Sequence, residues 1–419
     1  MTETVKTTPK DPRVMHIVAG MDIGNGDSKC KVQIDSDKPV VFDLPSVAAY
    51  TTGSNTPKVP TDDYMKNLYN NLDAEITGPG IKSNDEGRVF FSKRAIDSGE
   101  SLTMFNITNH VPKSHDSLST ILLDGILASR GVMHYYKTQG QLPKQLDLIA
   151  GVGVPLPIAD YLDYRESYKQ TLMSGIHLVT IRNFAEPITV KIKYQSVVVM
   201  AEGAAAQYAI TKLGPKFIQL AIDNARKHGA KIDPAYTGDL LSKATNSIGL
   251  DIGDGNVNIA VITNRAINIE ASTSIDKSYG TVLDGAVQDL ANTTASFKNR
   301  RDLSDFMRDP LNQVMPAQKA TYLQAQRAID NHKEILVRDI RSVFTDVFRK
   351  VGQRTQVVWV YGGGATPMQK NLEPVMIAET KVGAGQNIPI LWMDSTYSRN
   401  LNRNGLFDAA MYGVKASLQ

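Results

Sequence analysis

The sequence contains a single cysteine, Cys30, and no long uninterrupted hydrophobic run. One cysteine cannot form an intramolecular disulfide, so the chain suits a reducing compartment. The longest apolar stretch, Leu148–Ala159, contains Pro155 and Pro157 and is shorter than the ~20 residues that a membrane-spanning helix needs. Residues 1–13 are polar and charged and lack the apolar centre of a signal peptide. We therefore expect a cytoplasmic protein with no membrane partner and a disordered tail over residues 1–13.

The chain also lacks a large excess of charge of either sign. Lys and Arg number 46 and Asp and Glu number 43, which gives a formal net charge of +3. So small an excess cannot coat a nucleic-acid backbone, and we expect no direct strong nucleic-acid binding. One local basic cluster, Lys298–Arg301, is more typical of a solvated face or a subunit contact. The hydrophobic content of 42% is that of a globular protein, and 419 residues suit two or three domains.

Several motifs of nucleotide-binding and catalytic sites are missing. The sequence has no Gly-Lys dipeptide, hence no Walker A loop, and no Gly-x-Gly-x-x-Gly. It also lacks Gly-x-Ser-x-Gly and His-Glu-x-x-His. The motifs of P-loop, Rossmann, serine-hydrolase and zinc-protease sites are therefore all absent.

The sequence does contain the same arrangement of segments twice. Residues 14–47 and 247–262 each predict a strand, a tight glycine turn and a second strand. Each half also has a nearly continuous apolar run of strand length, Gln145–Val154 and Val357–Tyr361. Both runs predict a buried strand, and the first predicts a parallel one. Helices between these strands predict an α/β protein with two related halves. The predicted helices cover residues 119–136, 201–213, 217–228, 321–351 and 405–414, with a short strand and helix at 87–95 and a loop at 51–63.

Each half carries an Asp-x-Gly-x-Gly motif at the turn of its strand pair, Asp22–Gly26 and Asp251–Gly255. Glycines permit a sharp turn whose consecutive N–H groups can face an anion, which favours phosphate binding. An aspartate beside bound phosphates would repel them unless a divalent cation lay between, so the pattern implies Mg²⁺. Two structural β-turns are the alternative, because Asp and Gly are common in turns. The predicted phosphate-binding residues are Gly24, Asn25, Gly26, Lys29, Gly253, Asp254, Gly255 and Asn256.

A third glycine segment follows the buried strand of the second half. Val357–Tyr361 runs directly into Gly362, Gly363, Gly364 and Ala365. A flat base or ribose could lie against such bare backbone, so these four residues are predicted to contact a nucleoside. A glycine triplet alone is more often a flexible turn. Its position after the second phosphate-binding motif predicts a nucleotide site.

These segments, in this order, resemble the actin-like ATPase superfamily of actins, sugar kinases and chaperone ATPases. The resemblance comprises both Asp-x-Gly-x-Gly motifs, the Pro45–Ser46 strand end, the segment 87–99, the glycine segment and a final small-residue helix. It implies an α/β, actin-like (duplicated RNase H-like) fold of two domains with a nucleotide cleft between them. Domain I would comprise residues 14–203 and 395–419, and domain II residues 204–394.

The resemblance also implies roles for individual side chains. In the superfamily a polar residue at the start of the connecting helix orients the attacking water, so Glu202 is the expected catalytic carboxylate. A helix N-terminal glutamate favoured by the dipole is the alternative. Asp22 and Asp251 are the expected catalytic partners and Mg²⁺ carboxylates, acting through water. Lys333 and Glu334 weakly resemble a nucleoside-contacting pair, although a solvated helix face is the stronger expectation.

Within the superfamily, the sequence most resembles the plasmid-segregation actins of the ParM type. This implies an ATPase that forms homopolymeric filaments with ATP, or GTP, and Mg²⁺. Such filaments would drive plasmid segregation through a DNA-binding adaptor protein bound to centromere-like DNA. The alternative is a small-molecule kinase of the same superfamily, but no motif identifies an acceptor-binding carboxylate. The 48 residues between Glu202 and Asp251 are more than we expect from actin, and the segment 207–247 within them has no assigned role.

Overall fold

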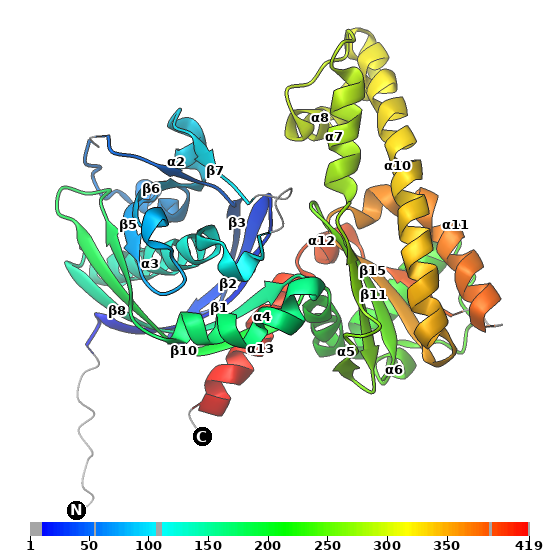
Figure 1. The fold of residues 1–419 in the computed structure, drawn as a ribbon, viewed down its shortest axis with the longest axis horizontal. Coiled ribbons are helices and arrows are strands. Elements are labelled where there is room, and N and C mark those ends of the chain that lie inside the picture. The colour runs from blue at the N-terminus through cyan, green and yellow to red at the C-terminus, as the bar shows by residue number, and fades with distance from the viewer. Residues whose placement is uncertain (1–10, 54–55, 106–110, 385–387, 418–419) are drawn as a thin grey trace, which may run out of the picture. The chain divides into compact units, whose positions relative to one another are not determined.

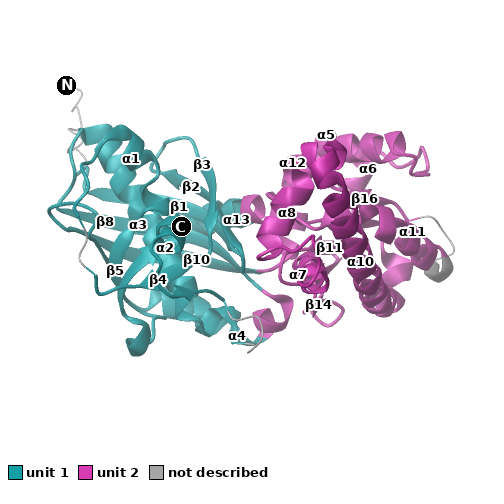
Figure 2. Cartoon of the chain, turned by 90° about the horizontal axis from the view of Figure 1, so that it is seen from above, with its two compact units in different colours: residues 1–156, 163–200, 406–419 teal, residues 157–162, 201–405 magenta. Residues whose placement is uncertain are grey.

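The structure of the protein is a computed structural model that describes residues 11–53, 56–105, 111–384 and 388–417 (Figure 1). Of the predicted tail, residues 1–10 lie outside the described residues. The chain divides into two compact units (Figure 2). Unit 1 comprises residues 1–156, 163–200 and 406–419, and unit 2 comprises residues 157–162 and 201–405. Among the described helices, none is long and apolar enough to cross a membrane.

Unit 1 is built on a ten-stranded sheet with the strand order β3-β2-β1-β8-β10-β9-β5-β6-β4-β7. The predicted first hairpin is present, since β1 and β2 pair antiparallel. Strand β8 pairs with β1 in parallel, as its nearly continuous apolar run predicts. The strands are β1 (Val14–Ile23), β2 (Asp27–Ile34), β3 (Val40–Pro45), β4 (Ala48–Tyr50), β5 (Asp73–Thr77), β6 (Gly87–Phe91), β7 (Leu102–Thr103), β8 (Gln145–Leu156), β9 (His177–Ile181) and β10 (Ile188–Ala201).

Helices pack on this sheet at very short range. A Cβ at Gly153 of β8 would lie 2.1 Å from the main-chain oxygen of Leu406, and one at Gly151 would lie 2.1 Å from Val414. Glycine is therefore required on β8 where the C-terminal helix α13 crosses it. The helices are α1 (Asp62–Lys66), α2 (Ser92–Asp97), α3 (Ser117–Gln139), α4 (Ile158–Met173) and α13 (Leu401–Ser417), with 3₁₀ turns η1 (Leu68–Asn70), η2 (Ser83–Asp85) and η3 (Lys113–His115).

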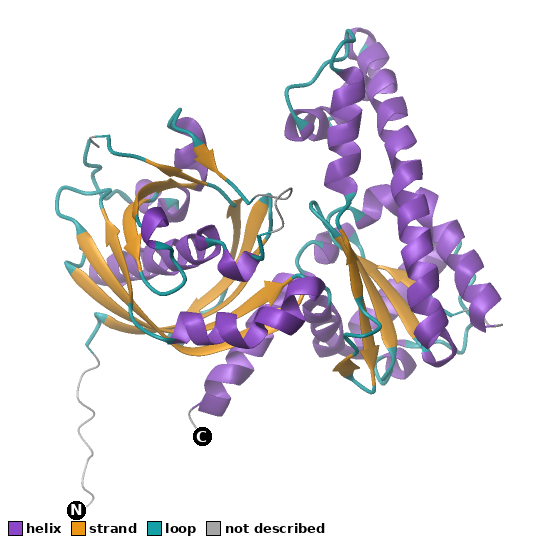
Figure 3. Ribbon diagram, in the orientation of Figure 1, coloured by secondary structure: helices purple, strands orange, loops and turns teal. Residues whose placement is uncertain are grey.

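Unit 2 has a central sheet with the order β13-β12-β11-β15-β16, and β14 also pairs with β12. Helices cover both faces of this sheet (Figure 3). On strand β15, Val358 and Val360 pack with α7, α10 and α11, whereas Val357, Trp359 and Tyr361 pack with α5 and α6. Burial on both faces explains why this strand is a continuous apolar run in the sequence.

The strands of unit 2 are β11 (Ser247–Ile252), β12 (Val257–Thr263), β13 (Ala266–Ile267), β14 (Thr273–Ile275), β15 (Val357–Tyr361) and β16 (Ile390–Trp392). Its helices are α5 (Ala204–Lys227), α6 (Gly238–Leu241), α7 (Tyr279–Leu290), α8 (Arg300–Arg308), α9 (Leu311–Val314), α10 (Pro316–Val351), α11 (Ala365–Ala384) and α12 (Ser395–Ser398), with a 3₁₀ turn η4 (Gly352–Arg354).

The two helices predicted at 201–213 and 217–228 form the single element α5. It is interrupted at Gly214, which has φ 78° and ψ −170°, and Pro215 follows. A left-handed glycine and a proline without an amide hydrogen both break helical hydrogen bonding. The break therefore falls between the two predicted helices.

The start of α5 differs from the prediction. Ala201 is the last residue of β10, and Gly203 turns the chain with φ 80°, so the helix begins at Ala204. Glu202 thus lies in the turn before the helix rather than in its first turn. Helix α10 also begins earlier than predicted, at Pro316, since proline is well suited to a first helical turn.

Candidate functional site

The first Asp-x-Gly-x-Gly motif forms the turn between β1 and β2 in unit 1. The amide of Gly24 donates to the main-chain oxygen of Asp27 at 3.1 Å, and a Cβ at Gly24 would lie 2.9 Å from that oxygen. Asn25 and Gly26 form the tip of the turn, and the main-chain oxygen of Gly26 accepts from Ser46 at 2.9 Å. The close approach explains the glycine at position 24.

Two ammonium groups lie at the base of this turn. Lys29 Nζ lies 3.6 Å from Asp22 Oδ2, and these residues are direct neighbours across the β1–β2 ladder. Lys113 Nζ donates to the main-chain oxygen of Ile23 at 3.3 Å. The sequence predicted Lys29 but not Lys113, which is 90 residues from its partner in the chain and has no distinctive local motif. Both cations add positive charge next to the turn, where an anion would be attracted.

The second motif forms the turn between β11 and β12 in unit 2, with an equivalent closing hydrogen bond. The amide of Gly253 donates to the main-chain oxygen of Asn256 at 3.0 Å. Asp254 is the exposed residue of this turn, and Gly255 beside it is buried. The Arg300 guanidinium pairs with Asp254 Oδ2 at 2.8 Å. The two motifs therefore make matching turns, one in each unit.

Glu202 lies beside the second turn and is 6% exposed. Asn258 Nδ2 donates to Glu202 Oε2 at 2.9 Å, and Asn256 Nδ2 donates to the same oxygen at 3.3 Å. Asn258 Oδ1 accepts from the Ser274 hydroxyl at 2.6 Å, which fixes the orientation of the amide. The carboxylate is thus held in a defined direction by two side-chain amides, one from the turn and one from strand β12. Asn258 was missed in the sequence because it lies outside the glycine motif.

Asp251 lies at the carboxyl end of β11 and is also 6% exposed. Asn402 Nδ2, from the start of α13, donates to Asp251 Oδ2 at 2.6 Å. Gly362 has φ +97°, and a Cβ there would lie 2.4 Å from Asp251 Oδ1 and from the main-chain oxygen of Ile252. The structure therefore brings the predicted glycine segment next to the second motif. No local signal marks Asn402 as a partner of a residue 151 positions away.

The remaining residues of the glycine segment have different surroundings. Gly364 donates its amide hydrogen to the main-chain oxygen of Ile252 at 2.8 Å, and a Cβ there would lie 2.6 Å from Tyr279 Cβ. Gly363 is exposed, with no atom within 4 Å of its Cβ position. Ala365 is buried and begins α11. Within the segment, Gly363 thus presents accessible backbone that no side chain covers.

Lys333 and Glu334 lie in the middle of α10. Lys333 Nζ lies 3.2 Å from Asp330 Oδ1, and Glu334 Oε2 lies 3.9 Å from Arg338, so both pair within the helix. The Glu334 side chain is 67% exposed and that of Lys333 is 15% exposed. Glu334 therefore lies on a solvated face, whereas the Lys333 side chain is largely covered and is paired with Asp330.

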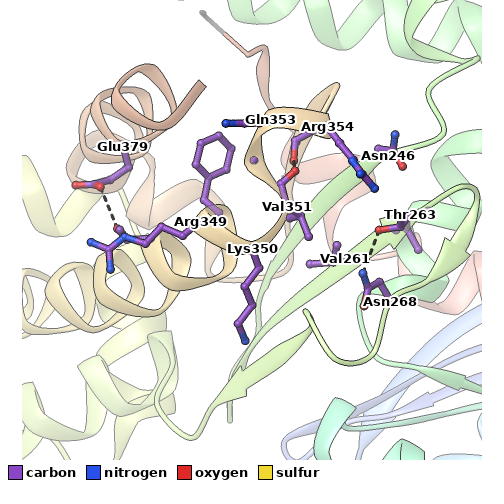
Figure 4. A pocket seen from close by; sticks show the side chains of 15 residues that line it. Asn246, Val261, Thr263, Asn268, Arg349, Lys350, Val351, Gln353, Arg354 and Glu379 are labelled. Atoms are coloured by element: carbon purple, nitrogen blue, oxygen red, sulfur yellow. Dashed lines mark hydrogen bonds between the residues drawn. The ribbon is translucent and has the colours of Figure 1, made fainter. Parts of the chain in front are cut away.

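Each unit contains a cavity. One of about 680 Å³ lies in unit 2 at the end of α10, where Arg349, Lys350 and Arg354 are among the lining residues (Figure 4). Another of about 10 Å³ lies in unit 1 beside Met21 and Lys113, and it is too small for any nucleotide. None of the residues predicted from the sequence to form the site lines either cavity.

Comparison with known proteins shows likeness in fold rather than in sequence. No protein-family model and no curated protein sequence matches the chain. An archaeal actin homolog matches with a TM-score of 0.59 at 15% identity, over 94% of this chain and 99% of that one. Bacillus thuringiensis ParM with ATP matches with a TM-score of 0.58 at 15% identity, over 96% of this chain and 100% of that one.

A further solved structure, psk41 ParM in apo form, has a TM-score of 0.53 at 15% identity, over 97% of this chain and 100% of that one. Each match spans nearly the whole of both chains, so it includes both units. The fold class predicted from the sequence is confirmed. The chain has an actin-like fold, similar to that of ParM.

Proposed function

We propose that the protein is an actin-like ATPase that polymerises with ATP, or GTP, and Mg²⁺ and hydrolyses the nucleotide. Its filaments would drive plasmid segregation through a DNA-binding adaptor bound to centromere-like DNA. The observation that carries this proposal is the pair of matching glycine turns, each with an aspartate at the end of the preceding strand. Similar folds in ParM structures with ATP, ADP and AMPPNP support a nucleotide as the ligand.

The residues of the two turns fit a magnesium nucleotide chemically. The main-chain amides of the turns would donate hydrogen bonds to phosphate oxygens, and Lys29 and Lys113 would add positive charge in unit 1. Asp22 and Asp251 supply carboxylate oxygens, which Mg²⁺ prefers, and Mg²⁺ commonly keeps several of its waters. When bound, the magnesium nucleotide supplies the phosphoryl group that is transferred to water.

Glu202 is the carboxylate that we assign to the attacking water. Asn256 and Asn258 hold its Oε2 atom, so the carboxylate keeps one orientation without rearrangement. A positioned general base typically contributes roughly 10²–10⁴-fold to the rate. The position of Glu202 before the helix, next to the second turn, favours this role over that of a helix N-terminal charge.

In this proposal the nucleotide acts as a conformational ligand. A ligand can shift the protein only by binding one conformation more tightly than the other. We infer that the triphosphate favours the polymerising conformation and that hydrolysis through Glu202 removes this preference. The filament would then weaken as phosphate is released.

Light scattering tests the proposal directly. Purified protein with Mg²⁺ is mixed with ATP, GTP, either diphosphate or no nucleotide, phosphate release is followed in parallel, and samples are imaged by negative stain. We expect filaments only with a triphosphate, which decay as phosphate appears. The preferred triphosphate identifies the base. A monomer that releases phosphate only when a small acceptor is added would instead show a kinase.

A further inference from the structure

The basic cluster at 298–301 has no role in the proposal so far. Asn299 is the N-cap of α8, and its side chain accepts hydrogen bonds from the amides of Arg301 and Asp302 at 3.0 Å each. This cap fixes the first residue of the helix, Arg300, against α7. Arg301 is exposed, whereas the Arg300 side chain is 26% exposed. The two adjacent arginines therefore have different surroundings.

Arg300 joins the second glycine turn to two helices. One guanidinium nitrogen lies 2.8 Å from Asp254 Oδ2, and the other lies 3.0 Å from Asp284 Oδ2 on α7. A planar guanidinium can bridge two carboxylates in this way, which an ammonium group does less well. The carboxylates are about half exposed, so the pairing is sensitive to salt.

The main chain of Asp254 is held by α7 as well. The Ser278 hydroxyl, at the N-cap of α7, donates to the main-chain oxygen of Asp254. A Cβ at Gly280 would lie 2.1 Å from that oxygen, so the helix approaches the turn as closely as a glycine allows. Asp254 is therefore held at its backbone by the Ser278 hydroxyl, where Gly280 allows α7 to come close, and at its carboxylate by Arg300.

The carboxylate of Asp254 has an electrostatic disadvantage in a phosphate-binding turn. Its negative charge repels phosphate oxygens, and the repulsion increases with the charge of the nucleotide. A guanidinium 2.8 Å away offsets this charge.

We propose that Arg300 is a positioning residue for the second phosphate-binding turn, where it neutralises Asp254 and holds the turn against α7 and α8. The inference rests on the proposed function for its nucleotide readout. This proposal gives Arg300 of the basic cluster an intramolecular role, rather than a role in binding nucleic acid or another subunit. Arg301, the exposed neighbour, has no such role.

The test is a double-mutant cycle on nucleotide affinity. Each protein is titrated with Mg-ATP and with Mg-ADP, or with the guanosine nucleotides if these are preferred. The proteins are wild type, Arg300→Gln, Arg300→Lys, Asp254→Asn and the double variant Arg300→Gln/Asp254→Asn. Arg301→Gln is the matched control. We expect Arg300→Gln to weaken triphosphate binding about three- to tenfold, more than diphosphate binding, with Arg300→Lys between it and wild type. The effect shrinks as salt is raised. Arg301→Gln changes either affinity less than about twofold.

The cycle separates charge neutralisation from a structural role. In the Asp254→Asn background no carboxylate needs to be neutralised, so Arg300→Gln is expected to have almost no further effect. An arginine that only supports the fold of α8 would weaken binding equally in both backgrounds, and that result overturns the proposal. An Arg300→Gln protein with wild-type affinity overturns it too.

Amide hydrogen exchange without nucleotide gives a readout that does not depend on the proposed function. We expect residues 253–256 to exchange faster in Arg300→Gln than in Arg301→Gln or wild type. If wild type binds no nucleotide, the proposed function fails while this comparison still tests the contact. Equal exchange in all three proteins would show that Arg300 does not hold the turn.

Discussion

The side-chain amide of Asn258 donates a hydrogen bond to Glu202 at 2.9 Å, and both side chains are buried. Glu202 lies between a strand and a helix, whereas Asn258 lies on a strand of the second hairpin. The contact therefore connects the expected catalytic carboxylate to the element that carries the second phosphate-binding motif. A side chain held in this way has little orientational freedom to lose during a reaction.

Replacing Glu202 with alanine should slow phosphate release by about 10²-fold or more, because the attacking water loses the group that orients it. Nucleotide binding and assembly should persist, since Glu202 is assigned to water rather than to the phosphates. Phosphate release and light scattering on the same samples measure the two effects. Glu270→Ala, at an exposed position of unit 2, is the control. Unchanged phosphate release would remove Glu202 from the catalytic role.

Replacing Asp22 with alanine should lower the affinity for nucleotide at least about tenfold when Mg²⁺ is present, because a carboxylate that holds the hydrated ion is lost. In the presence of EDTA the variant should bind at least as tightly as wild type, because the aspartate repels phosphates when no divalent cation lies between them. Calorimetric titration with and without Mg²⁺ measures this difference. Asp97→Ala, an exposed aspartate on α2, should behave as wild type. Wild-type affinity in Asp22→Ala with Mg²⁺ would contradict the metal assignment.

Alanine at Gly362 should destabilise the protein, whereas alanine at Gly363 should be tolerated. Gly362 has φ +97°, and its added Cβ would lie 2.4 Å from Asp251 and from Ile252. Backbone strain of this kind costs about 1–3 kcal/mol, and the overlap adds to it. Gly363 has open space at its Cβ position. Urea unfolding of the two variants measures the difference, and equal stability would show that the segment relaxes freely around the new side chain.

The stability of unit 1 should fall as pH rises above about 6.5, owing to His177. Its Nδ1 contacts Asp124 Oδ2 at 2.8 Å and its Nε2 contacts the main-chain oxygen of Leu172 at 3.0 Å. A carboxylate and a carbonyl oxygen only accept, so the imidazole can donate to both of them only in its charged form, with hydrogen on both ring nitrogens. Burial alone would lower the pKa of His177, but the charge of Asp124 and the hydrogen bonds to Asp124 and Leu172 raise the pKa above its ordinary 6.5.

A folded pKa above the unfolded value gives stabilisation that is complete below about 6.5 and is lost as pH rises through the folded pKa. Urea unfolding between pH 5.5 and 9 should show this loss in wild type and a flatter profile in His177→Gln. His16→Gln, at an exposed position of the same unit, should keep the wild-type slope. The same slope in His177→Gln would assign the pH dependence to other groups.

Features with a local sequence signal were predicted well. The two hairpins follow from apolar runs on either side of glycine turns, and the parallel strand β8 follows from a run buried on both faces. The helix predicted over residues 321–351 lies within α10, which spans Pro316–Val351. The glycine segment was placed correctly at the end of β15 because a continuous apolar strand precedes it.

Contacts between distant parts of the chain could not be predicted. Three such contacts in the site arise from tertiary packing, which no local sequence pattern encodes. They are the hydrogen bonds Asn402–Asp251 and Lys113–Ile23 and the ion pair Arg300–Asp254. The order of the outer strands of the first sheet could not be predicted either. Strand β9 pairs with β10 on one side and with β5, about 100 residues earlier in the chain, on the other. The start of α5 was misplaced because Ala and Glu suit a helix, while the turn is made by the left-handed backbone at Gly203.

The contact of α13 with β8 has a consequence for how the chain is made. Gly151 lies against Val414 and Gly153 lies against Leu406. Unit 1 therefore combines segments that precede and follow residues 201–405 in the chain. Unit 2 is almost entirely one continuous segment, residues 201–405. During synthesis, domains fold as their residues become available. Because residues 406–417 follow unit 2 in the chain, the sheet of unit 1 can receive helix α13 only after residues 201–405 have been synthesised.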